Sequence, residues 1–214
     1  GLAAVWATEN TREAIVAAMR RREVYATSGP RIAVRTYGGL NLPATVLETP
    51  GFPDSIQTEA VPMGGEIMGA GADDRFTMAI EAQADPKSVY LDRIQVVKGW
   101  IDASGEVRER VYDAAWSGDD GLQPDGSLAP VGSSVDLKTG LTTNSIGLPR
   151  LTVVWQDPEF DPAQSAFYYA RVLQILIARH SLLDKLALGD EDIDTRRPDT
   201  IQERAYTSPI WYRP

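Results

Sequence analysis

The chain has 214 residues, with 21 basic and 30 acidic side chains for a formal net charge of −9, no cysteine and a single histidine, His180. These counts exclude disulfide scaffolds, thiol nucleophiles, cysteine-ligated metal sites and a multi-histidine metal centre built from this chain alone. The acidic balance lacks the dense cationic face that a phosphate backbone requires, so no nucleic-acid partner is expected. The longest apolar stretch, residues 167–178, is shorter than the about 20 residues of a membrane-spanning helix, so no membrane partner is expected either.

Residues 10–24 have the pattern of an amphipathic helix. Asn10 can cap its first turn, and Glu13 follows three residues later, as in a capping box. Apolar side chains then recur at helical spacing with no glycine or proline between them. A short extended segment is expected at residues 24–27, and Ser28-Gly29-Pro30 ends it.

From residue 31 onward the pattern is typical of β-structure. Strands are expected at 31–37, 76–82, 91–100, 107–116 and 151–155, with a short strand at 45–47 and an aromatic extended end at 205–212. Residues 166–177 fit a strand or a helix by pattern, and their aromatic and β-branched side chains favour a strand. The turn residues 102–105 predict that 91–116 form a hairpin. Polar loops are expected at 117–134 and 189–200. Several strands between turn-rich loops predict a mainly β, antiparallel β-sandwich-like domain.

Few residues match a known catalytic pattern. His180, Ser181 and Asp184 lie too close together on one element to form a catalytic triad, which is assembled across a fold. We interpret His180 as a surface or structural side chain. The glycines at 69 and 71 lack the third glycine of a dinucleotide fingerprint, and two carboxylates follow them, so no phosphate loop is expected there.

An acidic loop near the C-terminus resembles part of a calcium loop. Asp190, Asp192 and Asp194 occupy its first ligand positions, but Thr195 and Ile201 stand where its glycine and its bidentate glutamate belong. A solvated loop is therefore the leading interpretation, and an adventitious calcium site is the alternative. A similar but weaker acidic group comprises Asp119, Asp120 and Asp125.

Aromatic and arginine-rich segments also leave two interpretations open. The aromatic side chains are Trp100, Trp116, Trp155, Trp211, Tyr206 and Tyr212. Core packing is the leading interpretation because each ring buries a large apolar area, and a sugar-binding face is the alternative. The run Arg20–Arg22 suits a solvated helix C-terminus, where the helix dipole favours cations, and a small-anion site is the alternative.

Several runs of this sequence resemble a known family. Residues 11–30 resemble the helix and strand that close a PHP barrel, the metal-dependent fold named for polymerase and histidinol phosphatase. Over nearly its whole length the chain resembles the C-terminal third of the bacterial domain-of-unknown-function family 3604. That resemblance is carried by LDRIQVVKGW at 91–100, VYD at 111–113, AWSG at 115–118, residues 157–169 and IQERAYTSPIWY at 201–212, and it is weakest at 174–188.

The resemblance implies a remote relation to PHP metallohydrolases, which bind two or three divalent metals through His, Asp and Glu at strand ends. Their H-x-H and D-x-H motifs are absent here and would lie upstream of Gly1. The resemblance therefore implies a piece of a longer protein, with residues 1–30 as the last helix and strand of the barrel and residues 31–214 as a β-rich C-terminal domain. It implies no catalytic residue, metal ligand or cofactor in this chain, and divalent metal ions in the intact protein.

Thr27 and Ser28 are the only residues for which the resemblance suggests a place near a substrate. Active sites of α/β barrels lie at the C-terminal ends of the strands. If residues 24–27 are the last barrel strand, Thr27 and Ser28 lie beside the pocket and orient the substrate or a metal-bound water. The alternative is that they only shape the turn before Pro30.

The leading functional hypothesis is a C-terminal accessory domain of a PHP-like metal-dependent hydrolase, inert by itself, whose partner is its own N-terminal barrel. The alternative is a self-standing ligand-binding module, with carbohydrate as the candidate ligand. A third hypothesis is an assembly domain that forms homo-oligomers through an exposed apolar patch. The lack of cysteine fits the bacterial cytoplasm and periplasm equally, so the sequence leaves the compartment open.

Overall fold

Strands make up most of the ordered elements. The structure, a computed structural model, describes residues 1–118, 121–124, 126–189 and 196–214. Its strands are β1 (Leu2–Val5), β2 (Val24–Thr27), β3 (Ala33–Leu40), β4 (Ala60–Pro62), β5 (Glu66–Met68), β6 (Phe76–Gln83), β7 (Leu91–Ile101), β8 (Val107–Trp116), β9 (Arg150–Gln156), β10 (Ala166–Gln174), β11 (Ile177–Ala178), β12 (Thr200–Ile201), β13 (Arg204–Thr207) and β14 (Ile210–Arg213). Its helices are α1 (Arg12–Arg20) and α2 (His180–Leu188), with short 3-10 turns η1 (Val46–Glu48) and η2 (Asp54–Ile56).

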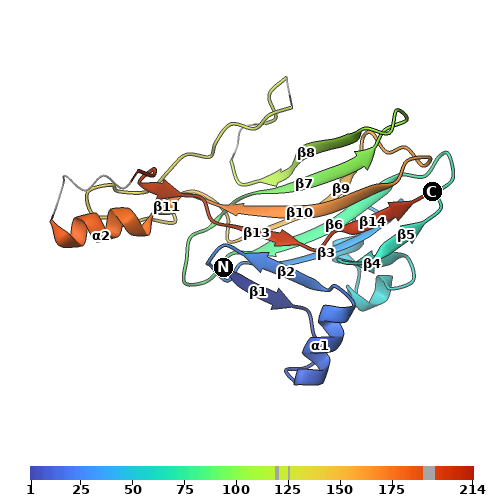
Figure 1. Cartoon of the computed structure of the whole chain (residues 1–214), viewed down its shortest axis with the longest axis horizontal. Coiled ribbons are helices and arrows are strands. Elements are labelled where there is room, and N and C mark those ends of the chain that lie inside the picture. Colours follow the sequence, from blue (N-terminus) through green and yellow to red (C-terminus); the bar gives the residue numbers. More distant parts are fainter. Residues whose placement is uncertain (119–120, 125, 190–195) are drawn as a thin grey trace.

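The larger sheet is organised around β10 (Figure 1). On one edge β10 pairs with β7, and β7 pairs with β8 as the predicted hairpin. On the other edge β13 lies beside residues 171–173 and β14 beside residues 166–168, so these two strands follow one another along β10. β2 and then β1 extend the sheet beyond β13. Pairing in this sheet is antiparallel except between β14 and β5, which are parallel.

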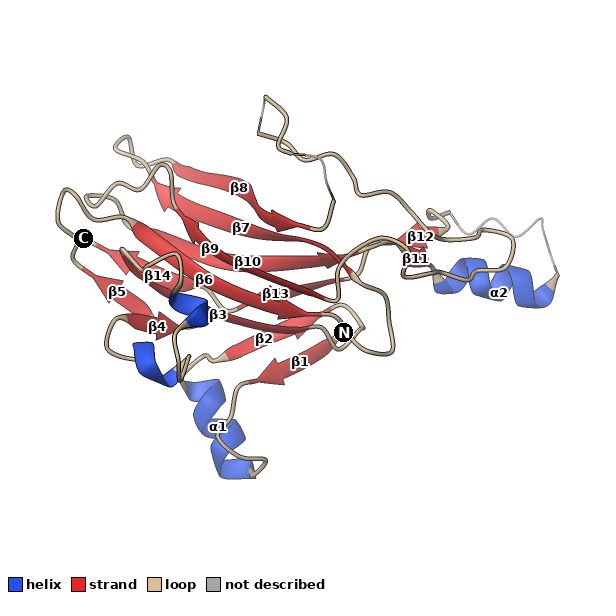
Figure 2. Ribbon diagram, turned by 180° about the vertical axis from the view of Figure 1, so that it is seen from behind, coloured by secondary structure: helices blue, strands red, loops and turns tan. Residues whose placement is uncertain are grey.

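The smaller sheet, with the order β4–β3–β6–β9, packs face to face on the larger one (Figure 2). Alternation along each strand sends every second side chain into the space between the sheets. The buried core there includes Val34, Phe76, Met78 and Ile80 from the smaller sheet and Ile94, Val96, Tyr168, Val172 and Ile210 from the larger sheet. Two sheets around one shared core confirm the predicted β-sandwich.

Residues 42–60 cover part of the outer side of the smaller sheet. Leu42, Val46 and Ile56 pack there against Ala79 in a second apolar cluster. The prediction of a strand at 45–47 is wrong, because the segment forms the 3-10 turn η1 and the Val46 amide donates to the Pro43 carbonyl. The apolar character of this segment reflects packing onto the sheet and not strand pairing.

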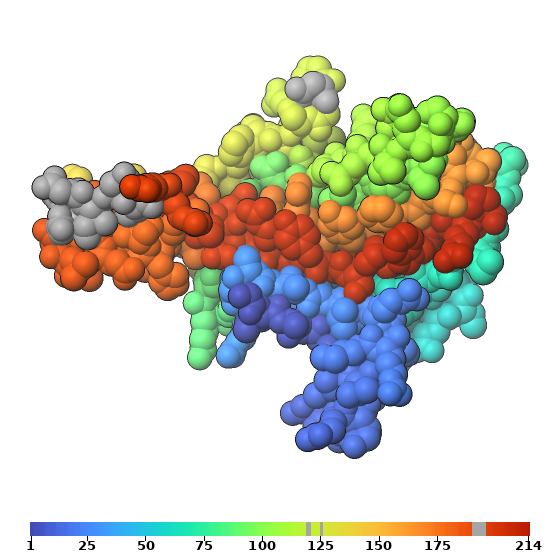
Figure 3. All heavy atoms as spheres, in the orientation of Figure 1, coloured from blue at the N-terminus to red at the C-terminus, as the bar shows by residue number. Residues whose placement is uncertain are grey.

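Helix α1 is confirmed, but it is shorter than the expected range 10–24. Thr11 caps it in place of Asn10, since the Thr11 hydroxyl accepts a hydrogen bond from the Ala14 amide at 3.3 Å. The helix ends at Arg20, and Arg22 then has a positive φ of 62°. Together with β1 and β2 this helix forms what we call the β1–α1–β2 unit, residues 1–27. The helix projects away from the sandwich (Figure 3).

The expected strand 166–177 is divided in the structure. β10 ends at Gln174, and a separate short strand, β11, pairs with β12. Helix α2 follows at once and was not predicted from the sequence; Gly189, with a φ of 64°, ends it. Neither helix in the described ranges is long and apolar enough to cross a bilayer.

Residues 1–30 are joined to the sandwich by a continuous ladder of hydrogen bonds. In that ladder Ala26 lies opposite Tyr206, and Thr27 lies opposite Ala205. The two ranges expected to be separate domains therefore share one sheet here. The division at residue 30 stays a prediction.

Candidate functional site

A hollow of about 550 Å³ lies between the β1–α1–β2 unit and the outer side of the smaller sheet. Its walls come from segments far apart in the sequence. They include Trp6 after β1, Arg21 and Glu23 after α1, Arg35 and Tyr37 on β3, and Asp54 in η2. We call this site the Trp6–Arg35 hollow.

Trp6 and Arg35 are stacked at the centre of this site. The Cζ atom of Arg35 lies 3.8 Å from the centroid of the Trp6 ring, a cation–π contact. The Trp6 ring is fixed because its Nε1 donates to the Val34 carbonyl at 2.8 Å and the Tyr25 ring lies 6.2 Å away. The same pair lines a second hollow of about 150 Å³.

Two carboxylates near Arg35, those of Glu23 and Glu81, pair with other arginines and not with Arg35. Arg21 Nε lies 2.6 Å from the Glu23 carboxylate. Glu81, directly across the strand pair from Arg35, forms an ion pair with Arg150 at 2.9 Å. Arg35 Nε is buried without a hydrogen-bond partner in the described part of the chain, and no ion pair joins its guanidinium to a carboxylate there. The site therefore holds a cation that forms no ion pair with the described residues, although the Asp54 carboxylate also lines the hollow.

Tyr37 adds a phenol to the same wall. Burial raises the pKa of Tyr37, while the positive charge of Arg35 acts in the opposite direction. The phenol is therefore neutral at neutral pH and can donate a hydrogen bond. A guanidinium, a phenol and aromatic surface suit the binding of an anion better than bond-breaking chemistry.

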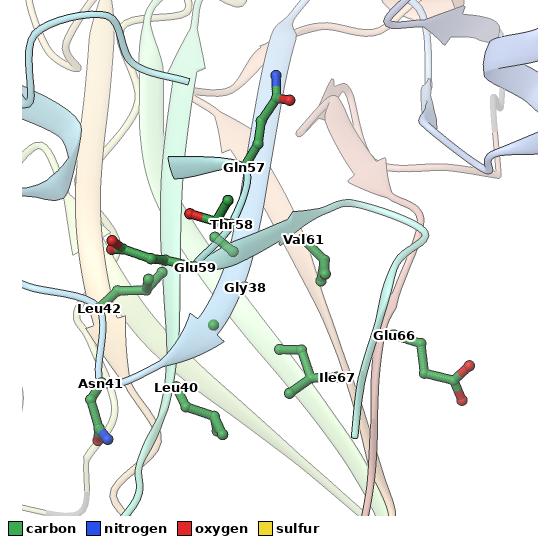
Figure 4. A pocket seen from close by; sticks show the side chains of 12 residues that line it. Gly38, Leu40, Asn41, Leu42, Gln57, Thr58, Glu59, Val61, Glu66 and Ile67 are labelled. Carbon is green, nitrogen blue, oxygen red and sulfur yellow. The ribbon is translucent and has the colours of Figure 1, made fainter. Parts of the chain in front are cut away.

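A neighbouring hollow of about 450 Å³ offers less chemistry (Figure 4). The side chains of Asn41, Glu59 and Glu66 point in different directions around it. Asn41 already bonds to the Asp74 carboxylate at 2.6 Å, and Glu66 forms an ion pair with Arg213. The polar groups do not converge on a common point, so we do not assign a ligand to it.

Thr27 and Ser28 lie at the end of β2, and neither lines the Trp6–Arg35 hollow. Thr27 is buried, and its hydroxyl has no hydrogen-bond partner among the described residues. Ser28 fastens β2 to β13, because its hydroxyl accepts from the Arg204 amide at 2.8 Å and donates to the Arg204 carbonyl at 3.3 Å. Their predicted role beside a substrate stays a prediction.

The other candidates from the sequence are scattered. His180 is exposed at the first turn of α2. Arg21 lines the Trp6–Arg35 hollow, whereas Arg20 and Arg22 do not. Within the described ranges no three His, Asp or Glu side chains lie together as metal ligands. Outside the described residues lie Asp119, Asp120, Asp125, Asp190, Asp192 and Asp194.

The predicted aromatic residues divide between the core shared by the two sheets and the outer face of the larger sheet, with Trp116 at the end of β8. Trp100, Trp155 and Tyr212 pack against the core, as the leading interpretation expects. Trp211 and Tyr206 lie on the outer face, because their partners across the ladder, Phe167 and Arg171, alternate with the buried side chains of β10. Trp116 is half-buried at the end of β8.

A buried polar cluster between the sheets is fully partnered. Lys98 Nζ lies 2.6 Å from the Asp157 carboxylate and donates to the Glu159 carbonyl at 2.7 Å. The Tyr168 hydroxyl donates to Asp157 at 2.7 Å, and the Glu159 amide donates to the same carboxylate at 2.9 Å. Each charge has its counter-charge and hydrogen bonds, which identifies this cluster as a structural clamp.

Sequence reasoning missed both Trp6 and Arg35. The alternation in residues 31–37 does indicate that Arg35 shares a face with Tyr37. No local pattern indicates that Trp6, nearly thirty residues earlier, stacks on that arginine. The signal that could have pointed to the site is Arg35 itself, an arginine on one face of a predicted strand in a chain of net negative charge.

Comparison with known proteins places the chain in a family. The family model described as a protein of unknown function (DUF3604) matches residues 1–214, in agreement with the resemblance found from the sequence. No curated protein and no solved structure matches the chain. Because the match spans the whole of the sequence, the chain belongs to the DUF3604 family of proteins of unknown function.

Proposed function

We propose that this chain is an accessory β-sandwich domain of a PHP-like metal-dependent hydrolase, joined through the β1–α1–β2 unit to a barrel domain that precedes it. The exposed apolar surface of this unit carries the proposal. Met19 and Val16 on α1 are 52% and 40% exposed, and Leu2 on β1 is 44% exposed. β1 is also the edge strand of the larger sheet. Apolar side chains beside an open strand edge are typical of a surface that another domain covers.

The divalent ions of a PHP-like hydrolase do not fit the residues that this structure describes. A site for such an ion needs several carboxylate or imidazole ligands together, and no such group occurs in the described ranges. Under this proposal the ligands belong to the preceding barrel. We assign no catalytic step to the present chain.

The direct test compares this chain with the full product of its gene. Both are assayed with Mn²⁺ or Zn²⁺ on p-nitrophenyl phosphate and p-nitrophenyl acetate, chosen as generic phosphoester and carboxyl-ester probes. We expect metal-dependent hydrolysis by the full product and none above buffer by the 214-residue chain. Turnover by the chain alone would overturn the proposal.

A second test addresses the surface itself. Met19→Glu in the full gene product should lower its thermal stability, since a charge would enter a covered apolar contact. Val107→Glu is the matched control, because Val107 is 82% exposed on a different strand. Equal effects of the two substitutions would contradict a covered α1. If the isolated chain forms dimers that Met19→Glu abolishes, the surface serves self-association instead.

A second candidate function, ligand binding, is favoured by a row of aromatic rings on the outer face of the larger sheet. The Trp211 and Phe167 ring centroids are 5.3 Å apart, Phe167 and Tyr169 are 6.4 Å apart, and Tyr169 and Tyr206 are 6.3 Å apart. Phe167 lies over Gly99, where a Cβ atom would come within 2.3 Å of the ring. Such a row can stack against the apolar faces of sugar rings.

One end of this row lies beside two arginines. Burial acts to raise the pKa of Tyr206, but the hydrogen bond and charge of Arg204 and the charge of Arg171 outweigh it, so the pKa is lowered. Acidic sugars are therefore favoured over neutral ones at this end.

Calorimetric titration with oligogalacturonate and with cellohexaose tests this second function. We expect saturable binding that is tighter for the acidic sugar and is lost in Phe167→Ala/Trp211→Ala. Val111→Ala, on the same face but outside the row, should bind as the wild type does. If neither sugar binds, this candidate function is excluded.

A further inference from the structure

We propose that the Trp6–Arg35 hollow binds a small organic monocarboxylate, with the Arg35 guanidinium as the partner of the carboxylate. The inference does not rest on the accessory-domain function, because every residue that it uses belongs to the present chain.

The Arg35 guanidinium is a cation without a hydrogen-bond or ion-pair partner in the described part of the chain. Arg93, a buried arginine of the larger sheet, shows what this fold does when it supplies all the partners. Its guanidinium bonds to the Asp92 carboxylate at 3.1 Å, and to the carbonyls of Leu128 and Ala129 at 3.3 and 3.0 Å. Arg35 has no comparable partner among the described residues, and its Nε is buried. A ligand in the hollow cannot reach the buried Nε, but the terminal guanidinium nitrogens of Arg35 also have no bonded partner among the described residues and can donate to a ligand's carboxylate.

The charged side chains that line the hollow determine which anion fits it. Glu23 and Asp54 also line the hollow, and Arg21 is already paired with Glu23 at 2.6 Å. Among the lining residues Arg35 is a cation outside any ion pair, and the nearby Asp54 carboxylate disfavours a second negative charge on a ligand, so a monoanion fits better than a phosphate dianion. The planar fork of an arginine also matches the two oxygens of a carboxylate.

The uncharged lining of the hollow determines what the rest of the ligand can be. Besides its charged groups the hollow is lined by the rings of Trp6 and Tyr37 and by Pro53, Ala60 and Pro62. Its volume of about 550 Å³ is within the range of small-molecule sites, about 300–1,000 Å³. The lining therefore favours a flat or apolar body attached to the carboxylate.

Benzoate is a suitable probe because it has one carboxylate on a flat apolar ring, and benzamide has the same shape without the charge. Titration of the 214-residue chain is followed through the indole N–H signals of its five tryptophans, with the Trp6 signal assigned from Trp6→Phe. We expect benzoate to shift the Trp6 signal in a saturable way in the millimolar range. Benzamide and inorganic phosphate should each bind at least about tenfold more weakly.

Substitutions locate the site. Arg35→Gln should weaken benzoate binding by at least about tenfold, and Arg35→Lys should weaken it by less, because it keeps the charge and loses the fork. Arg31→Gln is the matched control: Arg31 is exposed, lies just before the same strand and does not line the hollow. No Trp6 shift up to the solubility limit, an equal loss in Arg31→Gln, or equal binding of phosphate would each overturn the proposal.

Discussion

Lys98 and Arg35 are both cations on strands of the sandwich, but their side chains differ in the partners that they have within the chain. Lys98 lies between the sheets, 5% exposed, against a fully buried Asp157 at 2.6 Å. Arg35 lies at the edge of a hollow, stacked on Trp6, and forms no ion pair with a carboxylate in the described part of the chain. The comparison separates a polar group that holds the fold together from one that is left available to a ligand.

The largest expected effect comes from breaking the buried pair. Lys98→Met removes the ammonium and leaves the Asp157 carboxylate buried without its counter-charge. We expect the free energy of unfolding, measured by urea denaturation, to fall by about 3–5 kcal/mol. Arg108→Met, which breaks exposed pairs with Asp102 and Glu106, should cost much less than Lys98→Met. If Lys98→Met lowered the free energy of unfolding by no more than Arg108→Met does, the structural role of the cluster would be contradicted.

A smaller effect is expected from one hydrogen bond of the same cluster. Tyr168→Phe keeps the ring that stacks on Phe76 at 3.8 Å but removes the hydroxyl that donates to Asp157. Hydrogen bonds to charged groups contribute about 1.5–3 kcal/mol, so we expect a loss of that size in urea denaturation. The control, Tyr112→Phe, removes a hydroxyl bonded to Glu159 nearer the surface and should cost less. Equal losses would show that burial of the Asp157 carboxylate is unimportant.

β7, which carries Lys98, and its chain neighbours β6 and β8 could be predicted closely from the sequence because each follows a period of two, whereas the expected strand 166–177 ran past the end of β10 at Gln174. The ranges 76–82, 91–100 and 107–116 became β6, β7 and β8 with at most one residue of difference. The pairing of β2 with β13 could not be predicted in that way, since the two strands lie at opposite ends of the chain. Local periodicity determines where strands form, but sheet order depends on contacts distant in sequence.

The glutamate next to the cluster should give a still smaller, pH-dependent effect. The Tyr112 hydrogen bond lowers the pKa of Glu159, with a further contribution from Arg110. A carboxyl group whose pKa is lower in the folded state stabilises the fold above its unfolded pKa, and the stabilisation is lost as pH falls through the folded pKa.

Glu159→Gln should therefore be less stable than the wild type at neutral pH, and the difference should shrink as pH falls below about 4.3. Because Glu159 is 47% exposed, we expect the difference to stay below about 1 kcal/mol. This stability difference is measured from the urea midpoints of the wild type and of Glu159→Gln at a series of pH values from neutral to acidic. In the Tyr112→Phe background the stability difference caused by Glu159→Gln should be smaller. A stability difference that grows as the pH falls would contradict the lowered pKa of the Glu159 carboxyl group.

The hollow was harder to predict than the cluster. Residues 31–37 were expected to form a strand, and β3 begins at Ala33 with Arg35 and Tyr37 on its outer face. Trp6 lies in the connection between β1 and α1, where no periodicity constrains a side chain. The site exists because that connection passes over β3, which is a property of the tertiary fold and not of either segment alone.

The smallest expected effect concerns Arg35. Arg35→Met removes a cation–π contact of about 0.5–1 kcal/mol, but it also removes a buried Nε whose lack of a partner costs about 1–3 kcal/mol. These two contributions oppose each other, so the free energy of unfolding from urea denaturation should change by no more than about 1 kcal/mol. The shift of the Trp6 signal on addition of benzoate should disappear. Arg93→Met, which leaves Asp92 buried without its partner, should instead cost about 3–5 kcal/mol. A comparable loss for Arg35→Met would mean that the fold itself depends on Arg35, and the distinction between the clamp and the hollow would fail.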